Sequence, residues 1–205
     1  MLLKPFDGSD TSWEGIDGAS LYMCLPEFWY KCYNTSYGCD VSFTMNKEYT
    51  DDSWNHWDGK TLIACYKAQL AGDSDNVDSF DGNDPVLDGV YFESKPNSKP
   101  STKFSQKQGK QIARNMGDGF SLVTYEEHKI MQLLFYAYYG NVDTQAICGA
   151  GASVSDWDSN SHINGRVMDR VTNLNDTVAS NNPTCNHFWG LCDWWGNVNE
   201  WVDNI

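Results

Sequence analysis

Short apolar runs in the first third of the chain have the composition of β-strands. The runs 19–25, 28–33 and 41–44 are rich in aromatic and β-branched residues, and turn-forming residues separate them at Pro26, Asn34 and Gly38. This pattern predicts a meander of strands and turns. A polar stretch follows at 46–60, and the apolar run 62–70 predicts one further strand.

Two later segments carry apolar residues at helical spacing. Each begins with a capping box and ends at a glycine: Ser105 with Gln108 before Gly117, and Thr124 with Glu127 before Gly140. We therefore predict helices near 106–116 and 124–139, which pack on each other through Ile112, Met116, Ile130 and Leu134. Residues 71–103 are rich in Gly, Asp, Ser, Asn and Pro, which predicts a long surface loop with one strand near 86–92.

Length and charge limit the classes of partner. The chain has 205 residues and a formal net charge of −14, which suits one large domain and opposes nucleic-acid phosphates and anionic membranes. The lysines at 103, 107 and 110 fit the solvated face of one short helix. We expect no nucleic-acid partner and no membrane insertion. The first residues become polar too soon for a signal peptide, so we expect synthesis in the cytoplasm.

No arrangement of reactive side chains predicts catalysis. The seven cysteines include no C-x-x-C pair, which favours free buried thiols and leaves one or two disulfides as the alternative. The four histidines have no metal-binding spacing, and no serine lies in a G-x-S-x-G turn. We assign no catalytic residue.

The tryptophan-rich run 189–204 carries the most specific pattern. Gly190-Leu-Cys-Asp-Trp-Trp-Gly-Asn-Val-Asn-Glu-Trp201 resembles the signature Gly-Leu-x-Asp-x-x-Gly-Asn-Val-x-Glu-Trp of the formylglycine-generating enzyme-like proteins, a branch of the C-type lectin fold. The segment 113–128 is similar to that family's helix, glycine turn and second helix start. It departs from the pattern at Ser121 for Arg, Val123 for Pro and His128 for Trp.

The resemblance implies a fold. We expect an α+β, C-type-lectin-like domain over 59–205, with two helices on a small antiparallel sheet and long loops. A β-rich N-terminal segment, 1–58, precedes it and either pairs with it or mediates assembly. Such a fold usually returns its C-terminal strand beside its first one, so we expect the domain to lack its C-terminal part.

The same resemblance implies a calcium site. Family enzymes bind calcium at positions that match Asp193, Gly196, Val198 and Glu200, with side-chain oxygens at the outer two and carbonyls at the inner two. The alternative is that Glu200 and Asn197 only hydrogen-bond loop backbone within an aromatic core. The tryptophans of this motif fit a packed core better than a sugar-stacking surface: Trp189, Trp194, Trp195 and Trp201.

A weaker resemblance points to function. The segments 25–31, 139–149 and 186–191 are similar to phage and prophage proteins of gut bacteria, often tail or fibre components. This similarity implies a virion protein that recognises a glycan or protein on the host cell. It also implies that the protein forms a homo-oligomer and that it contacts other virion proteins. Two alternatives stay open, a formylglycine-generating enzyme-like oxidase and a structural virion decoration protein. In that family the oxidase works through cysteines that follow the Gly-Asn-Val-x-Glu-Trp strand. No cysteine follows Trp201 in this sequence, so we do not transfer the activity.

Overall fold

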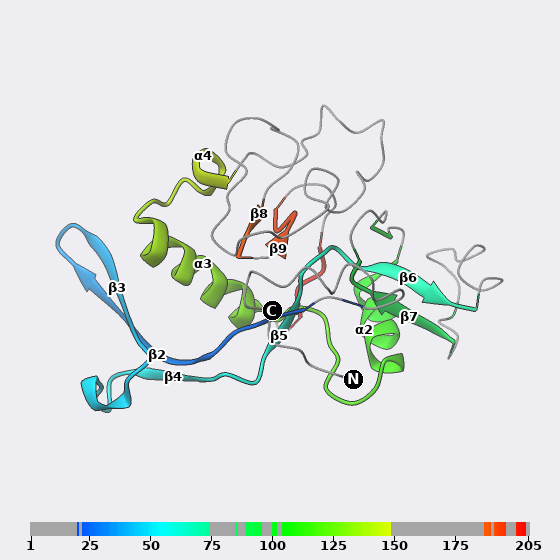
Figure 1. Ribbon diagram of the computed structural model, residues 1–205, viewed down its shortest axis with the longest axis horizontal. Helices are drawn as coiled ribbons and strands as arrows, with labels where there is room; N and C mark the ends of the chain where they lie inside the picture. The colour runs from blue at the N-terminus through cyan, green and yellow to red at the C-terminus, as the bar shows by residue number, and fades with distance from the viewer. Residues whose placement is uncertain are drawn as a thin grey trace, which may run out of the picture.

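A computed structural model describes residue 20 and residues 22–73, 85, 89–95, 100–101, 104–148, 187–189, 191–195 and 200–203. Short antiparallel strand pairs and a few helices make an α+β fold, as Figure 1 shows. The described strands form four small sheets instead of the one predicted sheet, because successive strands pair with different partners.

The N-terminal part forms a three-stranded sheet. Strand β1 spans Tyr22–Cys24, β2 spans Glu27–Thr35, β3 spans Gly38–Thr44 and β4 spans Asn55–Asp58. The sheet has the order β3-β2-β4, and the short 3-10 helix η2, Lys47–Tyr49, precedes β4. Pro26 lies between β1 and β2 as predicted. Asn34 does not break its strand, because it pairs with Cys39 and the turn falls at residues 36 and 37.

The run 62–70 is not one strand, so this prediction is wrong. Strand β5, Leu62–Ala64, pairs with β1, whereas β6, Gln69–Gly72, pairs with β7, Val90–Glu93. Between them the Tyr66 backbone N–H donates to Ser94 Oγ at 3.0 Å, which takes this residue out of a strand ladder. Strand β7 is the strand predicted within residues 71–103.

Both long helices are present, with their predicted caps. Helix α2 spans Gln106–Asn115 and α3 spans Tyr125–Tyr139. Both capping boxes form, and Gly140 ends α3 in the left-handed conformation, with φ of 61°. A short helix, α4, spans Thr144–Cys148.

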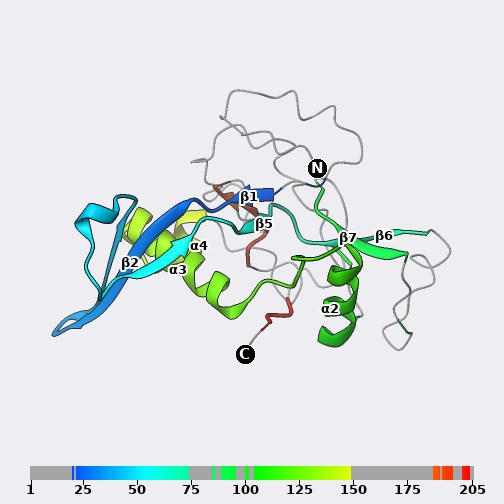
Figure 2. The ribbon, with the colours of Figure 1, turned by 90° about the horizontal axis from the view of Figure 1, so that it is seen from below.

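The helices do not pack on each other through the predicted side chains. Ile112 is buried in one cluster with Val90 and Phe92, so α2 covers the β6–β7 pair. Ile130 is buried in a second cluster, and Leu134 packs against it. The views of Figures 1 and 2 agree that α2 lies with β7, away from α3. The apolar residues of both helices have helical spacing, but those of α2 face one core and those of α3 face another.

The larger core joins distant parts of the chain. It contains Leu25 from the connection between β1 and β2, Phe28 and Tyr30 from β2, and Met131 and Phe135 from α3. Two short C-terminal strands, β8 at His187–Phe188 and β9 at Leu191–Cys192, complete it. Strand β1 shares a sheet with β5, and β2 shares a core with α3, so the segment before residue 58 packs with the chain that follows it.

Candidate functional site

The tryptophan-rich motif forms one wall of the larger core. Phe188, Leu191 and Cys192 are buried, and Trp194 and Trp195 pack partly buried against the same cluster. The rings of Phe188 and Trp195 stack with their centroids 5.7 Å apart.

Trp189 and Asp193 have unusual backbone conformations around β9. Their φ values are 50° and 55°, in the left-handed region that non-glycine residues seldom adopt. Trp189 follows β8 at the hairpin connection, where a tight turn requires such an angle. Asp193 directly follows β9, and its side chain is buried. These two backbone angles set the direction of the chain after β8 and after β9.

The two segments that carry the family resemblance lie against each other. The Asp203 backbone N–H donates to the Val123 carbonyl at 2.9 Å, and the Asp203 carbonyl accepts from the Tyr125 N–H at 3.0 Å. The ring of His128 stacks on Trp194, with centroids 5.5 Å apart. Residues near 200 thus bind the first turn of α3.

The same C-terminal stretch also reaches α2. Gln106 Nε2 donates to the Val202 carbonyl at 2.7 Å, and Trp201 Nε1 donates to the Phe104 carbonyl at 2.9 Å. Lys110 pairs with Asp203, so this lysine is not simply a solvated charge. Trp201 is half exposed and differs in this respect from Trp194 and Trp195. Residues 200–203 therefore connect the start of α2 with the start of α3.

A buried lysine lies beside one of the predicted calcium ligands. Lys67 is buried, and its Nζ contacts Glu200 Oε1 at 2.8 Å. Glu200 is itself exposed. An ammonium group on this carboxylate competes with a cation for the same oxygen. Among the described residues, no three His, Cys, Asp or Glu side chains are grouped to hold a metal ion.

The remaining residues of the calcium prediction, Gly196 and Val198, lie outside the described residues, as does Asn197. Calcium binding through Asp193 and Glu200 therefore stays a prediction.

His128 borders this charged pair. Burial lowers the pKa of His128, the nearby Glu200 carboxylate raises it, and Lys67 lowers it. The first effect is the largest, so the pKa lies below its ordinary value and the neutral imidazole is favoured. Neutral His128 can stack on Trp194 beside Lys67 without adding a second positive charge.

Two of the described thiols, those of Cys65 and Cys148, are poorly suited to nucleophilic chemistry. Burial raises the pKa of the Cys65 thiol and of the Cys148 thiol to about 12 each. At neutral pH both are therefore protonated, and the thiolate is the reactive form. Cys192 is buried, and Cys185 lies outside the described residues. Cys24 and Cys32 are exposed, so the prediction of buried thiols is wrong for these two. Sequence patterns alone could not reveal which thiols are buried.

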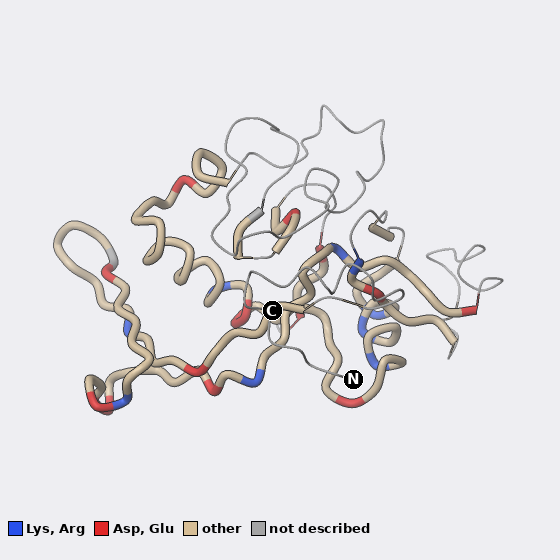
Figure 3. Tube along the Cα trace, viewed as in Figure 1, with Lys and Arg blue, Asp and Glu red and all other residues tan. Residues whose placement is uncertain are grey.

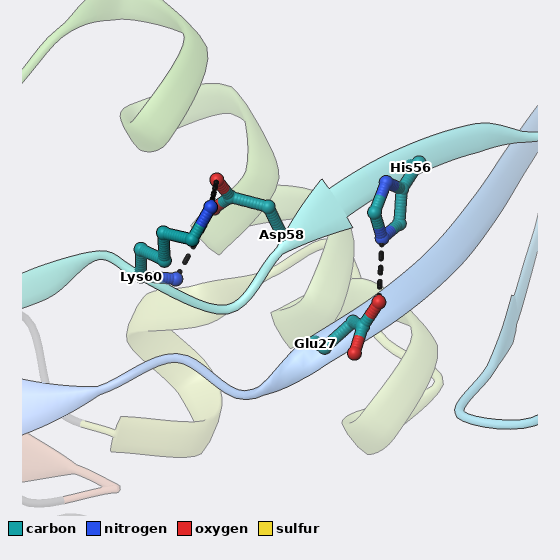
Figure 4. A network of polar contacts seen from close by, with 4 residues as sticks. All are labelled: Glu27, His56, Asp58 and Lys60. Atoms are coloured by element: carbon teal, nitrogen blue, oxygen red, sulfur yellow. Dashed lines mark hydrogen bonds and ion pairs between the residues drawn. The ribbon is translucent and has the colours of Figure 1, made fainter.

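The exposed side of the three-stranded sheet carries a small polar network, shown in Figure 4. His56 Nε2 contacts Glu27 Oε1 at 2.8 Å, and the His56 ring stacks on Trp29 at 4.9 Å between centroids. Lys60 Nζ contacts Asp58 Oδ2 at 3.2 Å. All four charged or titratable groups of these two pairs are largely exposed, so each pair contributes little stability.

A groove of about 450 Å³ opens between the N-terminal strands and α3. Its walls are almost entirely apolar and include Leu25, Phe28, Phe43, Leu134 and Trp189. Its size and lining are those of a site for an apolar group of a ligand. Sequence reasoning missed this groove because its residues come from three segments far apart in the chain.

Charge is distributed unevenly over the described chain. In Figure 3 several basic positions lie on α2, others are scattered, and the acidic positions are spread mainly over strands and connections. Within the described segments, no helix is long and apolar enough to cross a lipid bilayer.

Comparison with known protein families, curated proteins and solved structures finds no match to this chain in any of the three.

Proposed function

We propose that this protein is a non-enzymatic binding protein, a phage tail or fibre component whose C-type-lectin-like domain recognises a glycan or protein on the host cell. The observation that carries the proposal is the contact between the two resembling segments. His128 belongs to one and Trp194 to the other, and their rings stack with centroids 5.5 Å apart. Asp203, two residues after the second segment, is hydrogen-bonded through its backbone to Val123 and Tyr125 of the first. Two sequence patterns that belong to one family would be expected to form one structural unit.

The architecture supports a display function. Regular elements are short, and both cores are closed by side chains from several segments. A scaffold of this kind leaves connections at the surface, where binding residues are commonly carried. The apolar groove beside Trp189 offers one hollow for an apolar group of the ligand.

Two of the described thiols, those of Cys65 and Cys148, give no support to the oxidase alternative. Cys65 and Cys148 are protonated at neutral pH because burial raises their pKa to about 12. A cysteine-dependent oxidation would need a more acidic thiol than either.

In this proposal several copies act together on the virion. Repeating a weak site on one particle raises the overall binding strength by about 10²–10⁴ without new contacts. A site of modest affinity would then hold a cell.

Binding to cells tests the proposal directly. Fluorescently labelled protein is titrated on a panel of gut bacterial strains, with excess unlabelled protein as competitor. A labelled unrelated acidic protein of similar size is the control for charge. We expect saturable, competed binding to some strains and no binding of the control. Absence of saturable binding on every strain, together with oxidation of a cysteine-containing peptide, would instead assign the protein to the oxidase class.

A further inference from the structure

The outer edge of strand β3 is unusually open to pairing. In the described part of the chain, β3 pairs only with β2 and lies at one end of the order β3-β2-β4. It spans Gly38–Thr44, a length of seven residues. Its sequence contains no proline and no lysine, and its register with β2 runs without a bulge from Thr35↔Gly38 to Trp29↔Thr44. Prolines, lysines and bulges are features with which proteins usually protect exposed edges, and β3 has none of the three.

The opposite edge of the same sheet is protected. Strand β4 has only four residues, it includes His56 and Asp58, and Lys60 follows it closely. Short length and charge are two ways of preventing strand addition. The contrast within one sheet singles out β3 as the edge suited to a partner.

The turn that begins β3 is held in one conformation. Thr35 Oγ1 accepts from the Tyr37 backbone N–H at 3.3 Å and donates to the Gly38 carbonyl at 3.2 Å. Figures 1 and 2 both place this end of the β2–β3 hairpin at the outer limit of the described chain. The turn end of the strand is therefore presented away from the body in a fixed shape, whereas its other end packs against the larger core through Phe43.

The backbone alternation of β3 decides which groups point outward. A two-residue hairpin turn is closed by a hydrogen-bonded pair, here Thr35 with Gly38. Residues 38, 40, 42 and 44 then direct their backbone groups at β2. Residues 39, 41 and 43 direct theirs at the free edge.

A second copy of β3 fits this edge in one antiparallel register. A two-fold axis at Val41 places Val41 opposite its own copy and residue 39 opposite residue 43. The outward backbone groups of both strands then meet, which gives about six hydrogen bonds.

The side chains in this register are also complementary. The only charged residue of β3, Asp40, lies opposite Ser42 of the other copy instead of another carboxylate. Continuing the register by one residue at each end places Tyr37 opposite Met45. These two side chains are 100% and 71% exposed, among the most exposed large hydrophobic side chains described. A methionine sulfur beside an aromatic ring is a favourable contact.

We propose that two copies of this protein associate through β3, antiparallel about a two-fold axis at Val41, to form a continuous six-stranded sheet. The interface covers Tyr37 and Met45 of both copies. It is a small interface, so the dimer forms and dissociates at about micromolar concentration.

Sedimentation equilibrium of the full chain, across about 1–200 µM, tests the association. The monomer is 23.2 kDa, and we expect the mass to approach twice this value with rising concentration. Val41→Pro removes an outward N–H without removing a bond to β2, so it should weaken dimerisation by about tenfold or more. The matched control is Val41→Thr, which keeps the N–H and the β-branched shape and should dimerise like the wild type. Circular dichroism checks that both variants fold.

A charge exchange tests the register without proline. Tyr37→Lys and Met45→Glu should each weaken self-association by about tenfold when studied alone, because each removes an apolar contact twice per dimer. An equimolar mixture should recover dimer, because the mixed pair sets a lysine opposite a glutamate and keeps one Tyr37–Met45 contact.

Several results would overturn the proposal. A wild type that stays monomeric across the range would do so, as would a folded Val41→Pro variant that dimerises normally. Equal weakening by Val41→Pro and Val41→Thr would show that the backbone edge is not the contact. Failure of the mixed variants to recover dimer would exclude this register.

Discussion

The contact between Phe135 of α3 and Phe188 of β8 should be measurable as a coupling energy. Both rings are 1% exposed, and their centroids lie 5.2 Å apart at an interplanar angle of 83°. Replacing either phenylalanine by leucine removes three buried carbons, which at about 0.8 kcal/mol each amounts to about 2 kcal/mol. The edge-to-face pair contributes a further term of about 0.5–1.5 kcal/mol that only both rings together provide.

Urea unfolding of the wild type, Phe135→Leu, Phe188→Leu and the double variant measures both quantities. We expect each single change to lower the free energy of unfolding by about 2.5–3.5 kcal/mol. The double variant should lose less than the sum by the coupling energy, since the ring contact is lost only once. Tyr125→Leu is the matched control on the same helix, because its side chain is 58% exposed and the change should cost about 0.5 kcal/mol or less.

Two outcomes would refute this reasoning. Single changes that cost no more than the Tyr125 control would show that β8 does not pack on α3. Losses that add within about 0.3 kcal/mol would show that the two rings do not interact.

Three further predictions concern the cap, the histidine and calcium. Thr124→Ala removes the capping side chain of α3 and should lower the free energy of unfolding by about 1 kcal/mol, whereas Ser121→Ala at an exposed loop position should not. The folded state holds the pKa of His128 below 6.5, so the unfolded chain takes up the proton first and stability should decrease as pH falls below about 6.5; His128→Gln should reduce this dependence in melting curves from pH 7 to 5. The calcium prediction expects about 1 mM calcium to raise the melting temperature of the wild type but not of Asp193→Ala, and an unresponsive wild type would contradict it.

The sequence by itself determined the local structure wherever the decisive contacts are close along the chain. Both capping boxes and the Gly140 helix end formed as predicted, because each depends on residues within three or four positions. The break at Pro26 and the strand within residues 71–103 are of the same kind.

Only the tertiary structure decided what these elements pack against. Ile112 and Ile130 have the same helical spacing, yet they belong to different cores because β7 covers one helix and the tryptophan-rich motif covers the other. The run 62–70 divided into two strands for the same reason, since β1 and β7 are separate partners. The Lys67–Glu200 pair joins residues 133 positions apart, and no local pattern specifies such a contact. Periodicity records which face of an element is apolar, whereas the partner of that face depends on how the whole chain closes around it.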